Sequence, residues 1–264
     1  MFTYLVNHRF RPRLAPLLLA LLLAVPAFAP AQAQAPARER VDVELILMAD
    51  GSGSIDDDEF LLQRHGYARA LRHPRVLAAI RNGPTGRIAL SYVEWSGHLL
   101  QAVIADWVAI ASEADIDAFA SKLEETPRRI HGGGTAVGSA ILYGAESLLE
   151  NGFEASRSVI DLSGDGPDKD GLPAIVGREQ AVARGYTVNG LPILGTFPGL
   201  DVFYLDNVIG GPGAFSIPAN DFQDFYSAIL SKLIREIAGT GDPDAPQAAE
   251  AGPAPAGETA PGAP

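Results

Sequence analysis

The stretch Asp50-Gly51-Ser52-Gly53-Ser54 lies where an apolar run gives way to a helix. Residues 43–49, Val-Glu-Leu-Ile-Leu-Met-Ala, have the composition of a buried strand bounded by turn residues. Asp56 and Glu59 then offer a capping box, and apolar residues at helical spacing follow within 60–71. One carboxylate and two hydroxyls therefore lie on the turn that leaves a strand. Such oxygen ligands suit a hard divalent cation, although Asp, Ser and Gly are also ordinary turn residues.

Two later segments have the same character. His131-Gly132-Gly133-Gly134-Thr135 is a glycine-rich loop that ends in a threonine, and a helical pattern follows over 136–150. Residues 159–166, Val-Ile-Asp-Leu-Ser-Gly-Asp-Gly, read as a second buried strand that ends in Asp165-Gly166. Because sites in parallel sheets gather at the carboxyl ends of strands, we expect Asp50 and Asp165 to lie at one edge of the sheet.

Taken together, the three segments resemble the metal-ion-dependent adhesion site of the von Willebrand factor A family. That site combines D-x-S-x-S, a distant Thr and a strand-terminal Asp-Gly, and the resemblance covers roughly residues 41–238. The surrounding sequence is also similar to a branch of exported bacterial proteins known only as a domain of unknown function. The resemblance implies that Ser52, Ser54 and Thr135 contact a metal through their hydroxyls. It also implies that Asp50 and Asp165 contact the metal directly or through water.

The resemblance further implies what the metal does. A cation with few direct carboxylate ligands remains electrophilic, and it can accept a carboxylate from a partner at an open position. We therefore expect a divalent cation, Mg²⁺ first with Mn²⁺ or Ca²⁺ as alternatives, and a protein partner that presents Asp or Glu. Two rival functions remain: a metal-dependent hydrolase that uses the same ion, and a structural module whose site takes no ion. We expect no enzymatic activity, because the carboxylate-rich cluster of a two-metal hydrolase is missing from the pattern.

Strand and helix patterns alternate along the chain, which predicts a mainly parallel sheet covered on both faces. The expected fold class is a three-layer, doubly wound α/β fold. The strands at 87–95 and 99–107 are close enough in sequence to form a hairpin, which would supply one antiparallel edge strand. Asn220 with Gln223 is expected to cap the last helix, which runs to about Ile237. In adhesive members of the resembled family this helix can shift when the site takes a ligand; fixed packing is the simpler expectation here.

The two ends of the chain have other compositions. Residues 1–33 resemble a secretory signal peptide, with three arginines, an apolar core over 14–25 and a small-residue cleavage site at 31–33. A short leader over 34–40 precedes the domain, which spans 41–238. Residues 239–264 are rich in Ala, Pro and Gly and predict a disordered tail. We expect an exported protein, periplasmic or secreted, with no stable membrane anchor after cleavage.

Charge and cysteine content exclude several classes of function. The net charge is −12, and removal of a signal that carries three arginines and no acid takes it to −15. Such an acidic chain is not expected to bind nucleic acid or anionic membranes through charge. The sequence has no cysteine, which excludes disulfides, thiol catalysis and thiolate metal sites.

Other polar residues have simpler explanations. Glu94 and Asp161 lie within apolar strands and are expected to be buried, paired structural acids. Asp168 and Asp170 are expected to be solvated loop acids. Three histidines share no ligand spacing and are expected at the surface or at helix caps: His65, His73 and His98. The His131 loop is similar to an oxyanion loop of lipases, but that reading fails because the chain has no G-x-S-x-G and no histidine after His131.

Overall fold

The structure is a computed structural model that describes residues 37–195, 197–239 and 249–250. The predicted signal peptide over 1–33 and most of the predicted tail lie outside these residues, so both remain predictions. Within the described part of the chain, no helix is both long enough and apolar enough to cross a membrane.

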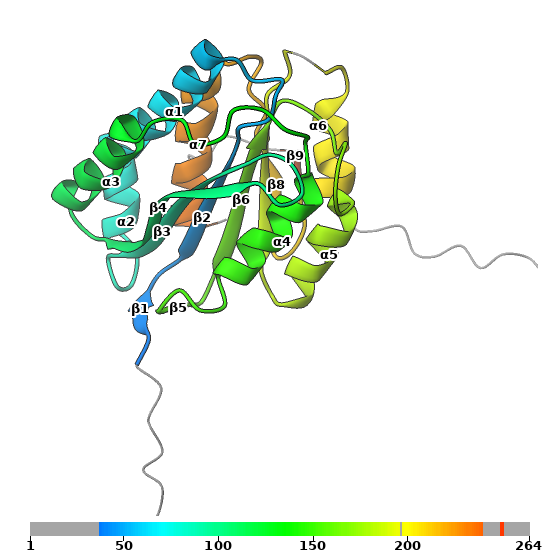
Figure 1. The fold of residues 1–264 in the computed structure, drawn as a ribbon. Coiled ribbons are helices and arrows are strands. Elements are labelled where there is room, and N and C mark those ends of the chain that lie inside the picture. The colour runs from blue at the N-terminus through cyan, green and yellow to red at the C-terminus, as the bar shows by residue number, and fades with distance from the viewer. Residues whose placement is uncertain (1–36, 196, 240–248, 251–264) are drawn as a thin grey trace, which may run out of the picture. The chain divides into compact units, whose positions relative to one another are not determined.

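A seven-stranded sheet runs through the domain in the order β4-β3-β2-β6-β7-β8-β9. Its strands are β2 (Glu44–Asp50), β3 (Ile88–Trp95), β4 (Gln101–Ile110), β6 (Ser158–Gly164), β7 (Thr187–Pro192), β8 (Phe215–Ser216) and β9 (Ala249–Glu250). Pairing is parallel from β3 to β8, while β4 is antiparallel to β3 and β9 is antiparallel to β8. A separate parallel pair joins β1 (Glu39–Val41) to β5 (Phe153–Ala155). The expected hairpin and mainly parallel sheet are confirmed (Figure 1).

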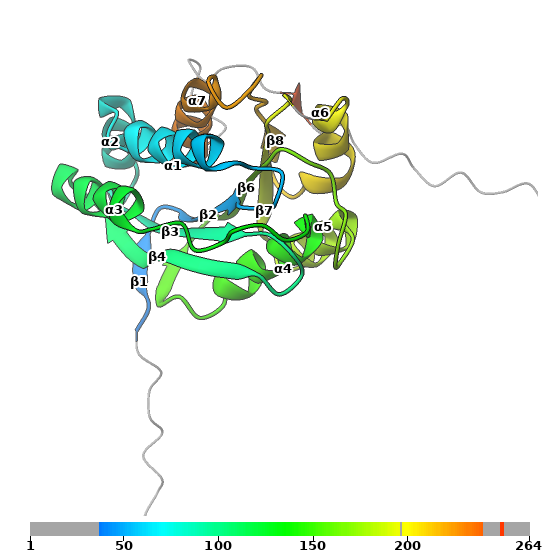
Figure 2. The same ribbon diagram turned by 45° about the horizontal axis from the view of Figure 1, so that its top comes forward.

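Helices cover both faces of this sheet, as Figure 2 shows. One face carries α1 (Asp57–Leu71), α2 (Pro74–Arg81), α3 (Glu113–Glu125) and α7 (Phe225–Ala238). The other carries α4 (Val137–Ser147) and α5 (Ala174–Ala183). The short α6 (Leu200–Phe203) continues into the π-helical turn η1 (Tyr204–Val208), which packs beside α5 and β7. The three-layer α/β class is therefore as predicted.

Strand β2 shows why this sequence forms a doubly covered sheet. Leu45 and Leu47 point into the hydrophobic core on the side of α1 and α7, whereas Ile46 and Met48 point into the core on the side of α4 and α5. All four side chains are fully buried. Because side chains alternate across a strand, a strand buried on both faces needs apolar residues on both of its sides.

Two helices begin at capping boxes, and the one predicted at Asp56 is confirmed. Asp56 with Glu59 caps α1, and Ser112 with Asp115 caps α3. The prediction that Asn220 caps the last helix is wrong, because α7 begins only at Phe225. Asn220 instead donates from its side chain to Asp224 Oδ2 at 2.9 Å, so the polar residues before α7 bond to one another in a turn.

A buried charge cluster joins α7 to the sheet. Lys232 Nζ lies 2.7 Å from Asp161 Oδ1 on β6 and also pairs with Glu236 one turn later on α7. Asn189 on β7 donates to Glu236 Oε1 at 3.0 Å. All four side chains are buried, which confirms Asp161 as a paired structural acid. Burial, and next the charge of Asp161, raise the pKa of Glu236.

Candidate metal site

The two predicted acids meet at the carboxyl ends of adjacent parallel strands. Asp50 is the last residue of β2, and Asp165 directly follows β6. The pairing of Ala49 with Ser163 fixes the register that brings them together. Both carboxylates are buried, with at most 1% of either residue exposed.

Hydrogen bonds link the D-x-S-x-S loop to Asp165. The backbone N–H of Ser52 donates to Asp50 Oδ1 at 2.7 Å, and the Ser52 and Ser54 hydroxyl oxygens lie 3.1 Å apart. Ser54 Oγ then donates to Asp165 Oδ1 at 2.7 Å. Oxygen atoms from both strand ends therefore form one continuous cluster, and Ser54 is its exposed member.

The Oδ2 atoms of the two acids are free to bind a cation. Asp50 Oδ2 and Asp165 Oδ2 are both buried, and neither has a hydrogen-bond partner among the described residues. Burial, and next the charge of Asp165, raise the pKa of Asp50 to about 7. Two buried acids at such close quarters are costly without a neutralising charge. The donor set of two carboxylates with neighbouring hydroxyls fits a hard divalent cation.

Thr135 ends the glycine loop, which contacts the D-x-S-x-S loop. The backbone N–H of Gly53 donates to Gly133 O at 3.3 Å, which joins this loop to the D-x-S-x-S loop. The carbonyl of Thr135 accepts from Lys169 N at 2.8 Å, which joins it to the segment that follows Asp165. Thr135 is only 4% exposed. The structure therefore joins four of the five predicted residues, Asp50, Ser52, Ser54 and Asp165, in one cluster and places the loop that ends in Thr135 against it.

Ser96, which follows β3, shapes the glycine loop and was missed by sequence reasoning. Its hydroxyl lies 3.0 Å from Gly132 O and 2.9 Å from Gly134 O, so one donor is shared between two carbonyls. Its own carbonyl accepts from Ala136 N at 3.0 Å. Thr135 is thus held from both sides by the end of β3. A serine after a strand is too common to signal this role.

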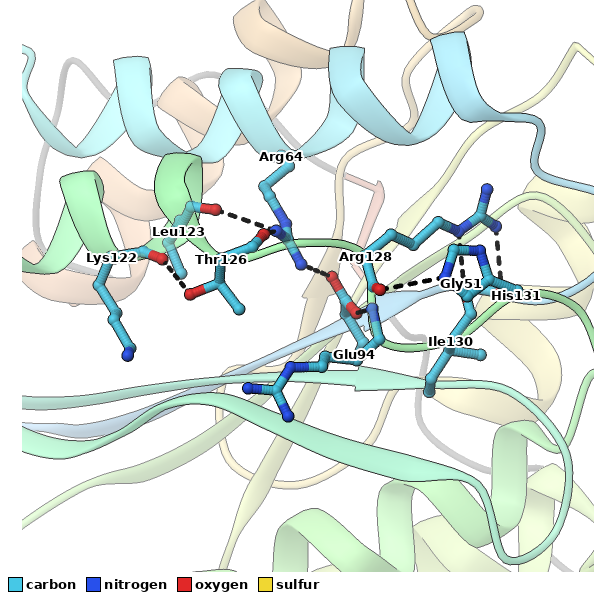
Figure 3. Close-up of polar contacts among 10 residues, drawn as sticks. Gly51, Arg64, Glu94, Lys122, Leu123, Thr126, Arg128, Ile130 and His131 are labelled. Atoms are coloured by element: carbon cyan, nitrogen blue, oxygen red, sulfur yellow. Dashed lines mark hydrogen bonds and ion pairs between the residues drawn. The ribbon is translucent and has the colours of Figure 1, made fainter.

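Arg128 contacts both the D-x-S-x-S loop and the segment before the glycine loop, and Figure 3 shows it beside Gly51 and Ile130. Its guanidinium donates to Ile130 O at 2.7 Å and to Ile55 O at 2.9 Å, and it pairs with Asp57 at 2.8 Å. It also reaches Gly51 O at 3.5 Å. Because these carbonyls belong to the two loops that carry Ser52 and Thr135, Arg128 sets their spacing.

Glu94 lies beneath this network and is the paired structural acid that we predicted. It forms a buried ion pair with Arg64 of α1, visible at the centre of Figure 3. Arg64 also donates to Leu123 O at 3.1 Å and to Thr126 O, which fixes the end of α3 against α1. Glu94 therefore helps to hold α1 and α3 in place, and it is not one of the candidate metal ligands.

The prediction for Asp168 is wrong. Its Oδ1 accepts from Val137 N at 2.8 Å and its Oδ2 accepts from Ala174 N at 2.6 Å. Because α4 and α5 have no side-chain cap at their own N-cap residues, Asp168 serves the first turns of both helices. It is half-buried, and burial raises its pKa. Asp170 is exposed, and it accepts from His98 N at 3.2 Å.

The histidines behave as expected. His65 is exposed, and His73 caps α2 by accepting from Arg75 N at 3.2 Å. His98 is exposed, and its Nδ1 lies 3.0 Å from Ser139 Oγ. Across the described ranges, no three His, Cys, Asp or Glu side chains gather in a way that could hold a metal. The candidate site has two carboxylates, and hydroxyls supply its remaining side-chain oxygens.

Replacing Gly133 by Ala is expected to damage the site. Gly133 has φ +116°, and an added Cβ would lie 2.5 Å from Ser96 Oγ. Gly152 is a matched control, with φ +84° and nothing within 4 Å of an added Cβ. The backbone strain of Ala costs roughly 1–2 kcal/mol at either glycine, but only Gly133→Ala also displaces Ser96. We expect a larger fall in melting temperature for Gly133→Ala, and equal falls would contradict the tight fit.

Comparison with known proteins identifies a family and a fold. The family model described as "Protein of unknown function (DUF1194)" matches residues 40–241. No curated protein matches the sequence. Among solved structures, proximal thread matrix protein 1 from the mussel byssus has 17% identity and a TM-score of 0.58, over 76% of this chain and 50% of that one. A further structure of that protein, described as having a zinc-occupied MIDAS motif, has 16% identity and a TM-score of 0.58, over 76% and 49%.

Two bacterial structures are also similar. A von Willebrand factor type A protein from Catenulispora acidiphila has 15% identity and a TM-score of 0.52, over 75% of this chain and 43% of that one. The pilus adhesin SpaC from Lactobacillus rhamnosus GG has 15% identity and a TM-score of 0.54, over 75% and 30%. This chain spans half or less of these proteins, and at such identities the likeness shows the fold alone. The chain therefore belongs to the DUF1194 family, and its fold is that of a von Willebrand factor A domain.

Proposed function

We propose that this protein binds a divalent cation at the candidate metal site and, through that cation, an acidic group of a protein partner. The observation that carries the proposal is the pair of buried oxygens, Asp50 Oδ2 and Asp165 Oδ2, that lack hydrogen-bond partners among the described residues. They lie in a cluster with the Ser52 and Ser54 hydroxyls, and Thr135 ends the adjoining loop. A divalent cation would supply the positive charge that two neighbouring carboxylates need.

The ligand types favour a hard ion. Every proposed ligand atom is a carboxylate or hydroxyl oxygen, and the sequence has no cysteine. We propose Mg²⁺ as the resident ion, with Mn²⁺ or Ca²⁺ as alternatives. The mussel protein whose MIDAS motif is described as zinc-occupied supports the idea that this fold holds a divalent ion at such a motif.

The partner follows from the charge of the site. The serine and threonine hydroxyls add no charge, and the two carboxylates would contact the ion directly or through water. An ion with so few direct carboxylate ligands retains affinity for a further carboxylate, so we propose that the partner presents Asp or Glu. Ser54 is exposed, which leaves an approach from solvent. Similar folds in a thread matrix protein and a pilus adhesin support binding rather than turnover.

The remaining parts of the proposal rest on the sequence. A signal-like segment over 1–33 supports export to the periplasm or the medium, without a stable membrane anchor after cleavage. The net charge of −12 supports a partner other than nucleic acid. The rival hydrolase would use the same ion, and steady turnover of a phosphoester or peptide by the metal-loaded protein would favour it.

Calorimetry with Mg²⁺ tests the cation directly. We expect one principal site in the purified wild-type chain and at least about tenfold weaker binding in Thr135→Ala, because one hydroxyl ligand is lost. Thr187→Ala is the matched control, since Thr187 Oγ1 donates to Pro212 O at 3.0 Å, away from the site. Equal binding by wild type and Thr135→Ala would place the ion elsewhere.

A further inference from the structure

Two neighbouring leucines are exposed beside the candidate metal site. Leu99 is 83% exposed and Leu100 is 49% exposed. They lie on the turn between β3 and β4, which follows the carboxyl end of β3 and therefore lies at the same edge of the sheet as Asp50. Single exposed leucines are common on protein surfaces, so the surroundings of this pair decide what it means.

The turn that carries the leucines is held firmly. Ser96 N donates to Leu100 O at 2.9 Å, and Leu100 N donates to Gly97 O at 3.0 Å. His98 fastens the turn to two further segments, through Asp170 Oδ2 at 3.2 Å and Ser139 Oγ at 3.0 Å. Because this backbone is already ordered, a ligand that covers the leucines does not have to order the turn first.

One of the two leucines contacts the glycine loop that adjoins the candidate metal site. Leu100 Cδ1 lies 3.1 Å from the position that a Cβ on Gly133 would occupy, so its side chain rests against the glycine loop. Gly133 is two residues before Thr135, and Ser96 holds both sides of that loop. Leu100 is therefore a half-exposed apolar side chain in contact with the loop that carries Thr135, and Leu99 is its more exposed neighbour.

We propose that Leu99 and Leu100 select the partner, by contacting an apolar carbon chain next to the carboxylate that binds the ion. The inference rests on the proposed function, because the carboxylate must be held by the metal. Covering the leucines removes apolar surface from water, and it also excludes water from the ion–carboxylate contact, which strengthens that contact. The fitting partner group is thus an acidic side chain with an apolar neighbour, rather than an isolated acid on a polar surface.

Simple carboxylates test this without knowledge of the partner. The full chain is loaded with Mn²⁺, and acetate, butyrate and hexanoate are titrated at constant ionic strength. Water-proton relaxation by the bound Mn²⁺ reports binding, and 1-hexanol serves as the uncharged control. A fully buried methylene improves affinity about fourfold, so with partial cover we expect hexanoate to bind about tenfold more tightly than acetate.

Matched variants assign the preference to the leucines. The double variant Leu99→Ser/Leu100→Ser removes the pair, and Leu99→Ser alone changes the more exposed residue without touching the glycine loop. The control Val108→Ser/Leu149→Ser removes two exposed apolar residues, at 41% and 45%, far along β4 and after α4; their exposure matches that of Leu100. We expect wild type and control to prefer hexanoate, and the leucine variants to lose most of that preference while their Mn²⁺ affinity is unchanged.

Three results would overturn the inference. A flat series in Mn²⁺-loaded wild type would mean that no apolar contact lies beside the ion. A preference that survives in both leucine variants would place the contact elsewhere. Failure to bind Mn²⁺ at all would contradict the proposed function and this inference together. The first two results, obtained with Mn²⁺ bound, would overturn this inference alone.

Discussion

Replacing Lys232 by Met is expected to lower the free energy of unfolding by about 3–5 kcal/mol, because it leaves buried carboxyl groups without their cation. Lys232 Nζ lies between Asp161 on β6 and Glu236 on α7, and all three side chains are buried. Met has nearly the same length and apolar volume, so the loss reflects charge rather than a cavity. Urea denaturation at pH 8 measures it.

Controls separate the charge effect from general damage. Lys122→Met changes an exposed lysine of α3 and should alter stability by no more than about 0.5 kcal/mol. Adding Asp161→Asn to Lys232→Met should recover part of the lost stability, because it removes the buried carboxylate that Lys232→Met leaves without a cation. A loss below about 1 kcal/mol for Lys232→Met would show that the cluster does not anchor α7.

The same cluster bears on whether α7 moves. The family resemblance allows a last helix that shifts when the site takes a ligand. A shift of one turn, about 5.4 Å, would take Lys232 away from Asp161 and Glu236 away from Asn189. The cluster therefore favours a fixed α7, and hydrogen exchange across α7 should change little on ligand binding.

Asp50→Asn is expected to make the metal-free protein more stable at pH 8, by roughly 2–4 kcal/mol, while it weakens metal binding. In the wild type, burial and the neighbouring Asp165 raise the pKa of Asp50 from 3.8 to about 7. Above that pH the folded protein must hold two buried carboxylates beside each other. Asn removes one of these charges and keeps the shape of the side chain.

The sign of the pH dependence follows from the raised pKa. Folded Asp50 keeps its proton to a higher pH than Asp50 in the unfolded chain does. The stability that this difference in pKa contributes is therefore fully present below about pH 4. It is lost as the pH rises through about 7. With a chelator present, wild-type stability should fall by about 2 kcal/mol more than that of Asp50→Asn between pH 5.5 and 8. Comparing the variants cancels other titrating groups, and equal slopes would contradict a raised pKa.

The sequence was sufficient to predict those features of the fold that depend on neighbouring residues. Strand β2 is apolar at each position that faces either core, and two of the helices begin at capping boxes that can be read directly. The convergence of Asp50 and Asp165 could be predicted because both end parallel strands. Their adjacency depends on the β2–β6 pairing, which only the fold supplies.

What could not be predicted depends on contacts between distant segments. Asp168 lies in a polar loop, where a solvated acid would be expected. It caps two helices only because the fold places the uncapped starts of α4 and α5 beside it. Ser96 and Arg128 act on loops that lie more than thirty residues away in sequence. The start of α7 was misplaced because Asn220 bonds to Asp224 in a turn, which competes with its use as a helix cap.

Anomalous scattering from crystals grown with Mn²⁺ tests whether the ion binds at the candidate metal site. We expect one strong peak that contacts the Ser52, Ser54 and Thr135 hydroxyls and lies beside Asp50 and Asp165, and no such peak in crystals of Asp50→Asn. A peak elsewhere, or none at a Mn²⁺ concentration that saturates binding in solution, would contradict it.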